Sequence, residues 1–268
     1  MNPTVVESWP KIRSNISYHA GKLGKSAEEI EATLKQLHAL ALACSSYSQQ
    51  RKMAQCIGQL LLESDGAPLI YAPCCADYRN TTDGKTDFSA AGLGMGIPPL
   101  ALQQIRFLQR IQEIVPQARP ILLMPDQEGS KHEKARARGL TEEEIRDRIC
   151  ASAQALQKHV EGTGIAVSLF SVLMPNVVER ELCVAEELLA DPKALYVIND
   201  MAHSRASYYH QMDSRMIYAD RSRLQARSAA QYVVLGQFAA QKRALLCSYN
   251  QESIPWYNRT EAVILSAP

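Results

Sequence analysis

The chain has 268 residues, of which 46% are apolar and 21% are charged, and this balance excludes an intrinsically disordered protein. Its 29 basic and 28 acidic residues leave a formal net charge of +1, so no bulk electrostatic attraction draws it toward nucleic acid or membrane surfaces. The longest apolar stretch, residues 165–174, is too short to span a bilayer, and the 7 unevenly spaced cysteines favour reduced thiols in a cytoplasmic protein.

Two helices are predicted ahead of the first strand. Ser26 and Glu29 have the spacing of a capping box, and leucines at helical intervals extend the predicted helix from Ala27 to about Leu42. A second helix is expected at about residues 49–63. Residues 1–66 are therefore expected to be an N-terminal helical extension, followed by one compact unit at residues 67–268.

The rest of the chain alternates between short apolar runs and longer segments with helical periodicity. Strands are expected at about residues 69–72, 120–124, 164–170, 244–248 and 262–266. Helices are expected at about residues 97–115, 141–159, 177–189, 204–216 and 221–241. The segment 73–96 has neither period, which is typical of a functional or mobile loop.

Each predicted strand is apolar nearly throughout, and helices separate most of the strands. Strands of this kind are buried on both faces, as in a parallel sheet with helices on either side. The sequence therefore predicts an α/β protein, a Rossmann-like mostly parallel sheet with helices on both faces and an N-terminal helical extension.

Polar residues follow three of the predicted strands. Ligands bind to open parallel sheets at the carboxyl ends of the strands, where the strand order reverses. Residues of the first, second and fourth strand ends are therefore expected to converge on a substrate, namely Cys74, Asp77, Tyr78 and Arg79, then Asp126 and Glu128, and then Asn250. The alternative for the carboxylates is that they cap the helices that follow them.

Cys74 is the candidate nucleophile of this group, with Asp77 and Tyr78 orienting the substrate. Because Pro73 cannot donate to a strand ladder, the first strand is expected to end near Ala72 and to leave the Cys74 thiol partly exposed. The thiol should then react with iodoacetamide faster than the cysteines outside this strand end, namely Cys44, Cys56, Cys150, Cys183 and Cys247. The alternative is a small buried side chain at a strand end.

Three further features are candidates for binding. Gly94 lies in a glycine run ahead of a predicted helix, which suits either an anion or a plain flexible loop. Arg227 and Gln231 are four residues apart on one face of the late helix, where they would meet an anionic substrate. His203 is either an acid or base or a hydrogen-bonded structural histidine.

A basic run follows the second predicted strand. Despite the near-neutral net charge, such a local patch suits the phosphates of a nucleic acid. The alternative is a solvated surface. The residues of this run are Lys131, Lys134, Arg136 and Arg138.

Two stretches resemble the tRNA-dependent cyclodipeptide synthases: residues 124–159, with Asp126 and the basic run, and residues 230–249. The resemblance covers about half the chain. It implies a Rossmann-like domain akin to class I aminoacyl-tRNA synthetases, which transfers aminoacyl groups from charged tRNA through an acyl-enzyme. Tyr232 matches the family's tyrosine on the late helix, and Gly236 stands where the family has a glutamate. Cys74 lies where the family has a serine-containing turn.

Together these features favour a group-transfer enzyme for an amino-acid-like small molecule, with Cys74, Asp77, Tyr78 and Tyr232 as catalytic residues. Aminoacyl transfer from charged tRNA is the form that the resemblance implies. No cofactor, metal or membrane partner is assigned, and the oligomeric state stays open. The alternatives are a transferase that uses a nucleotide or S-adenosylmethionine, and a non-catalytic binding protein.

Overall fold

A computed structural model describes residues 24–44, 67–74, 79–80, 86–87, 97, 99–126, 141–204, 217–248 and 253–266. Five strands form one parallel sheet in the order β5-β4-β1-β6-β7. The chain builds outward from β1 through β4 to β5 and then crosses to the other side of β1, so the strand order reverses between β1 and β6. This is a Rossmann-like order, and it confirms the predicted α/β sheet. The strands are β1 (Leu69–Pro73), β4 (Arg119–Met124), β5 (Ala166–Leu169), β6 (Leu245–Ser248) and β7 (Val263–Ser266).

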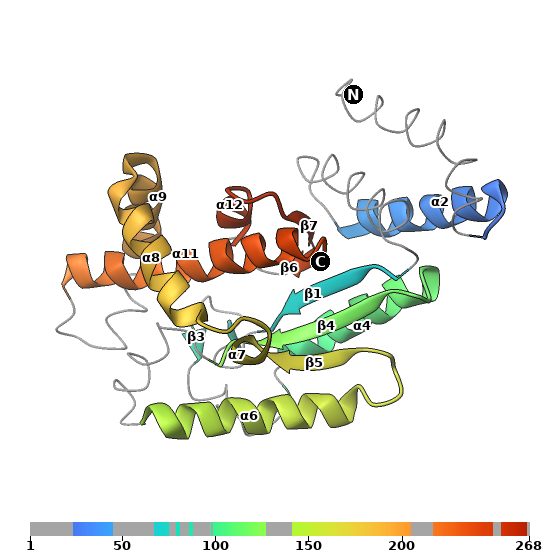
Figure 1. The fold of residues 1–268 in the computed structure, drawn as a ribbon, viewed down its shortest axis with the longest axis horizontal. Coiled ribbons are helices and arrows are strands. Elements are labelled where there is room, and N and C mark those ends of the chain that lie inside the picture. The colour runs from blue at the N-terminus through green and yellow to red at the C-terminus, as the bar shows by residue number, and fades with distance from the viewer. Residues whose placement is uncertain are drawn as a thin grey trace.

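Helices cover both faces of the sheet, as Figure 1 shows. Ile70 and Ala72 face one core, which α4 and α6 close, and Tyr71 faces the other, which α11 and α12 close. Both faces of β1 are therefore buried, which explains why its residues are apolar without alternation. The bounds of these helices are Pro99–Ile114 for α4, Glu142–His159 for α6, Tyr218–Gln241 for α11 and Ile254–Tyr257 for α12.

Both predicted capping boxes are present. At α6 the Thr141 hydroxyl accepts from the Glu144 backbone N–H at 3.1 Å, and the Glu144 carboxylate accepts from the Thr141 N–H at 2.7 Å. Ser26 and Glu29 do the same at α2 (Ala27–Cys44), which lies against α4 through the buried Ile30. These backbone hydrogen bonds lower the pKa of Glu29 and Glu144.

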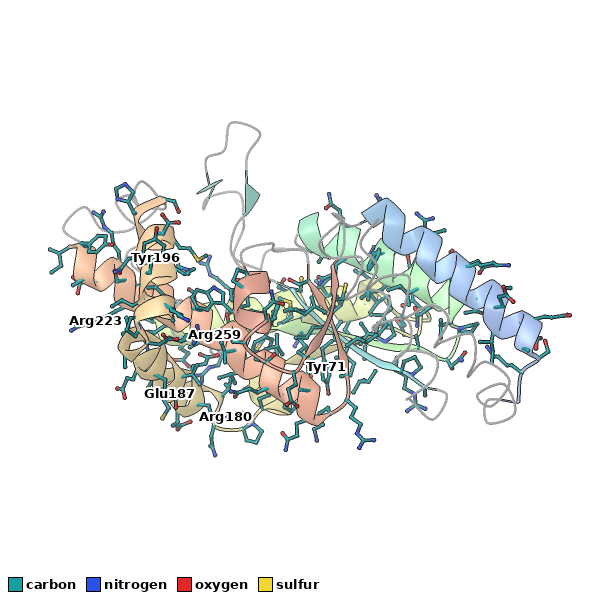
Figure 2. All side chains as sticks on the ribbon, turned by 90° about the horizontal axis from the view of Figure 1, so that it is seen from above. Tyr71, Arg180, Glu187, Tyr196, Arg223 and Arg259 are labelled. Carbon is teal, nitrogen blue, oxygen red and sulfur yellow. The ribbon has the colours of Figure 1, made fainter. Side chains whose placement is uncertain are left out.

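A helical layer packs on the side of α11 that faces away from the sheet. It consists of α8 and α9, joined to β5 by the short α7, and its buried contacts with α11 are made largely by alanines. Two labelled arginines in Figure 2 tie it down: Arg180 donates to Gln237 of α11 at 3.4 Å, and Arg259 pairs with Asp191. The bounds are Phe170–Leu173 for α7, Val177–Ala190 for α8 and Pro192–Ser204 for α9.

Helix α9 is not among the predicted helices. The residues at its start are nevertheless typical of a helix N-terminus. The Asp191 side chain accepts from the Lys193 N–H at 3.0 Å, and Pro192 suits a first helical turn. The second predicted helix, at residues 49–63, lies outside the described residues, as does nearly all of the one at residues 204–216.

Gly236 of α11 marks a close approach between this helix and the chain that leads into β7. A Cβ added at Gly236 would lie 2.5 Å from the Thr260 hydroxyl oxygen. That hydroxyl cannot turn away cheaply, because it donates to the Tyr257 carbonyl at 2.7 Å and accepts from the Ala262 N–H at 3.2 Å. While Thr260 holds this position, there is no room for a side chain on residue 236. A glutamate, which the resembled family has at the corresponding position, would therefore not fit here.

Replacing Gly236 with Ala is expected to lower the free energy of unfolding by about 1–3 kcal/mol, through overpacking against Thr260. The sign is diagnostic, because Gly→Ala in an unhindered helix raises stability by about 1 kcal/mol. Urea denaturation measures the difference, with Gln241→Ala, at an exposed position in the last turn of the same helix, as the control. A more stable Gly236→Ala protein would contradict the close approach.

Candidate functional site

The carboxyl ends of β1 and β6 are joined by the side chain of Gln104 on α4. Its amide Nε2 donates to the Pro73 carbonyl at 3.1 Å and to the Cys247 carbonyl at 3.5 Å, and the residue is 2% exposed. A buried amide with both acceptors on neighbouring strands fixes the spacing of those strands. The bridge therefore lies at the point of the sheet where the strand order reverses.

A group of buried hydroxyls lies on the other face of the sheet, at the end of β6. The hydroxyls of Ser248 and Ser253 are 2.9 Å apart, and both residues are buried. Close by, burial raises the pKa of the Tyr257 phenol well above its ordinary value, so this hydroxyl stays protonated. The ring of Tyr232 meets that of Tyr257 edge to face, with centroids 5.5 Å apart. The group is uncharged and suits hydrogen bonding to a polar substrate.

Asp126 lies at the same edge of the sheet, at the end of β4, and is buried. Its carboxylate accepts from the backbone N–H of Ser171 at 3.0 Å and from the Ser171 hydroxyl. Because Ser171 lies in the first turn of α7, the carboxylate caps the helix that follows β5. The sequence left open a capping role at the next helix in the chain, which is α6, whereas Asp126 caps α7; binding of substrate by Asp126 stays a prediction.

Cys74 corrects the expectation of a partly exposed thiol, because it is only 2% exposed. The Cys74 N–H donates to the Leu123 carbonyl at 2.8 Å, so the ladder between β1 and β4 continues one residue past Pro73. The side chain therefore keeps the alternation of the strand and enters the same core as Ile70 and Ala72. This placement favours the packing role over that of a nucleophile.

Apolar residues of α11 show which way its polar residues Arg227 and Gln231 face. Gln231 and Arg227 lie on the same stripe of α11 as Val234 and Phe238, which pack on the sheet. Gln231 is buried and Arg227 half-buried. His203, by contrast, is exposed in the last turn of α9, on the side of α11 away from the sheet, so it does not join this group.

The remaining candidates are not brought together in the described part of the chain. Arg79 begins a two-stranded antiparallel ribbon of β2 (Arg79–Asn80) and β3 (Thr86–Asp87), which is a separate sheet and stands clear of the main one in Figure 2. The others lie outside the described residues: Asp77, Tyr78, Gly94, Glu128, Lys131, Lys134, Arg136, Arg138 and Asn250.

Several buried polar residues were not singled out from the sequence. Their common signal is a polar side chain at a position where the helical period calls for an apolar one. Gln104 interrupts the apolar stripe of α4, and Glu181 interrupts that of α8 between Val177 and Ala185. Ser253 and Tyr257 have no such signal, because α12 is a single turn.

The described residues contain neither a metal-binding cluster nor a membrane-spanning helix. No three histidine, cysteine or acidic side chains in these segments gather in a way that would hold a metal ion. Among the described helices, none has the length and apolar character needed to cross a membrane.

Comparison with known proteins gives a remote likeness to solved structures. No family model matches the chain, and no curated protein matches it in sequence. Among solved structures, the PvcA protein of Pseudomonas aeruginosa is similar over 90% of this chain and 83% of that chain, at 17% identity and a TM-score of 0.47. A likeness at this level carries no conclusion about function.

Replacing Gln104 with Leu is expected to lower the free energy of unfolding by about 2 kcal/mol, because two backbone carbonyls at the strand ends would lose their donor. Urea denaturation measures the change. Gln103→Leu, at an exposed position of the same helix, is the matched control and should change stability little. Equal effects of the two substitutions would contradict the bridge.

Among the four cysteines whose side chains the structure describes, alkylation of the native protein is expected to modify Cys183 first, because its side chain is exposed. Cys74 and Cys247 are buried and should be modified only on unfolding. Burial and the nearby Asp126 raise the pKa of the Cys150 thiol, which should slow its reaction. Peptide mapping by mass spectrometry after brief iodoacetamide treatment gives the order, and the same treatment in urea is the control. If Cys74 were modified as fast as Cys183, the burial of its thiol would be contradicted.

Proposed function

We propose that the protein is a group-transfer enzyme that binds an amino-acid-like substrate at the carboxyl ends of β1 and β6. One observation carries this proposal: the strand order reverses between these two strands, and buried polar side chains gather at their ends. Such a reversal opens a crevice between the connections to either side, which is where parallel sheets of this type bind ligands. The side chains are those of Gln104, Ser248 and Ser253.

The character of these groups supports a small polar substrate. The hydroxyls and amides at the strand ends are neutral, and the protonated Tyr257 phenol adds another neutral hydroxyl. Tyr232 is half-buried and presents an aromatic ring beside them. Neutral hydrogen-bonding groups next to an aromatic surface suit the polar and apolar parts of an amino acid. Tyr232 therefore keeps its proposed place among the catalytic residues.

The nucleophile of the transfer is not assigned to Cys74, whose thiol lies in the core. Asp77 and Tyr78 follow directly in the chain and keep the proposed role of orienting the substrate. Asn250 follows β6 in the same way. No cofactor is part of this proposal.

Transfer of an aminoacyl group from charged tRNA is the specific form of the reaction that we propose. Its support is the position of the basic run, which the chain enters just after β4. Asp126 is buried at the carboxyl edge of the sheet, and Lys131 follows it five residues later in the sequence. Phosphates held there would bring the aminoacyl end of a tRNA to the strand ends.

Replacing Lys131, Lys134, Arg136 and Arg138 together with Ala is expected to weaken binding of charged tRNA and to reduce its salt dependence. Each lost phosphate contact should lower the slope of log affinity against log salt by about one. Gel shifts at several salt concentrations measure both. The control is Lys158→Ala with Lys242→Ala, two exposed lysines that precede β5 and β6 and lie at the opposite edge of the sheet. Absence of any shift by wild-type protein at low salt would remove tRNA from the proposal.

A further inference from the structure

Helix α11 reaches from the middle of the sheet to beyond the ends of the strands. The rings of Phe238 and Tyr71 lie 5.4 Å apart, which places Phe238 level with the middle of β1. From Tyr71 the strand runs about 7 Å further to Pro73. Gln231 precedes Phe238 by two helical turns, or about 10 Å in the same direction. Gln231 is therefore level with the strand ends, and Figure 1 shows the N-terminal half of α11 projecting past them.

The side chain of Gln231 also lies on the face of α11 that packs on the sheet. Seven residues are close to two full turns, so Gln231 lies on the same stripe as Phe238, with Val234 and Leu235 between them. This stripe packs on the sheet and on Val177 at the start of α8, whereas α9 contacts the alanines of a different face. The side chain thus extends toward the carboxyl ends of the strands.

The amide of Gln231 is buried, at 6% exposure, and its Nε2 has no hydrogen-bond partner among the residues that the structure describes. The other two glutamines buried among the described residues are both satisfied. Gln104 donates to two backbone carbonyls, and Gln225 of α11 donates to the Met201 sulfur at 3.8 Å. A buried donor without an acceptor destabilises the free protein, so its presence at a strand-end position indicates an acceptor that arrives from outside.

We propose that Gln231 determines substrate specificity in this site, because its side-chain amide donates a hydrogen bond to a carboxylate or carbonyl oxygen of the bound amino-acid-like substrate. An amide Nε2 only donates, so its partner must be an acceptor. Arg227 lies one turn further out on the same stripe, and its positive charge favours an anionic oxygen. This proposal rests on the function proposed above.

The test compares Gln231→Met with Gln225→Met, because Met keeps the length of the side chain and removes the amide. Both glutamines are buried on α11, but only that of Gln225 has an acceptor within the protein. Gln231→Met should leave the melting temperature of the free protein unchanged or higher, and Gln225→Met should lower it. The ligand probes are the twenty standard L-amino acids and, for the one that raises the wild-type melting temperature most, the amino alcohol that lacks the carboxylate.

Titration calorimetry should show that Gln231→Met weakens binding of that amino acid at least about tenfold, the loss expected for a hydrogen bond to a charged group. Binding of the amino alcohol should not differ between this variant and wild type, and Gln225→Met should bind both as wild type does. A large fall in the melting temperature of Gln231→Met, or its failure to fold, would overturn the proposal, because the amide would then have an internal role. Undiminished amino-acid binding by Gln231→Met would overturn it while the proposed function stands. If no amino acid stabilises the wild-type protein, both are overturned.

Discussion

The amide of Gln104 holds together the two strands between which the sheet changes direction. A crossover of this kind leaves the ends of β1 and β6 with connections that run to opposite sides, and nothing in the ladder itself keeps them at a fixed spacing beyond their last residues. By accepting from one amide, the Pro73 and Cys247 carbonyls become part of a single rigid unit. Ser248, which directly follows Cys247, is positioned by the same bridge.

Uncharged groups dominate this edge of the sheet. Burial holds the pKa of the Tyr257 phenol well above its ordinary value, so the hydroxyl keeps its proton near neutral pH, and the serines and glutamines around it do not titrate. Asp126, the buried carboxylate at this edge, is engaged by Ser171 in capping a helix. Recognition at such a surface works through direction and shape, because neutral donors discriminate by leaving a mismatched ligand with unmade hydrogen bonds. Further out on α11, Arg227 adds a positive charge.

Much of the fold could be predicted because its signals are local. The apolar strands are buried on both faces, and the Ser26 and Thr141 capping boxes satisfy their own helix ends whatever else is nearby. The site was less accessible to prediction because it depends on long-range geometry. Cys74 is buried because its backbone N–H bonds to Leu123, which belongs to another strand. The proposed role of Gln231 depends on its amide having no acceptor among the described residues, which no periodicity can reveal.

The contact between Gly236 and Thr260 has a consequence for how this chain can diverge. The helix and the segment before the last strand share a space with no room for another carbon atom, and the threonine that fills it also fixes the turn after Tyr257. A change at either position is harmful until the other has changed. Relatives of this protein should therefore show the two positions varying as a pair, with a larger residue at one accompanied by a smaller residue at the other.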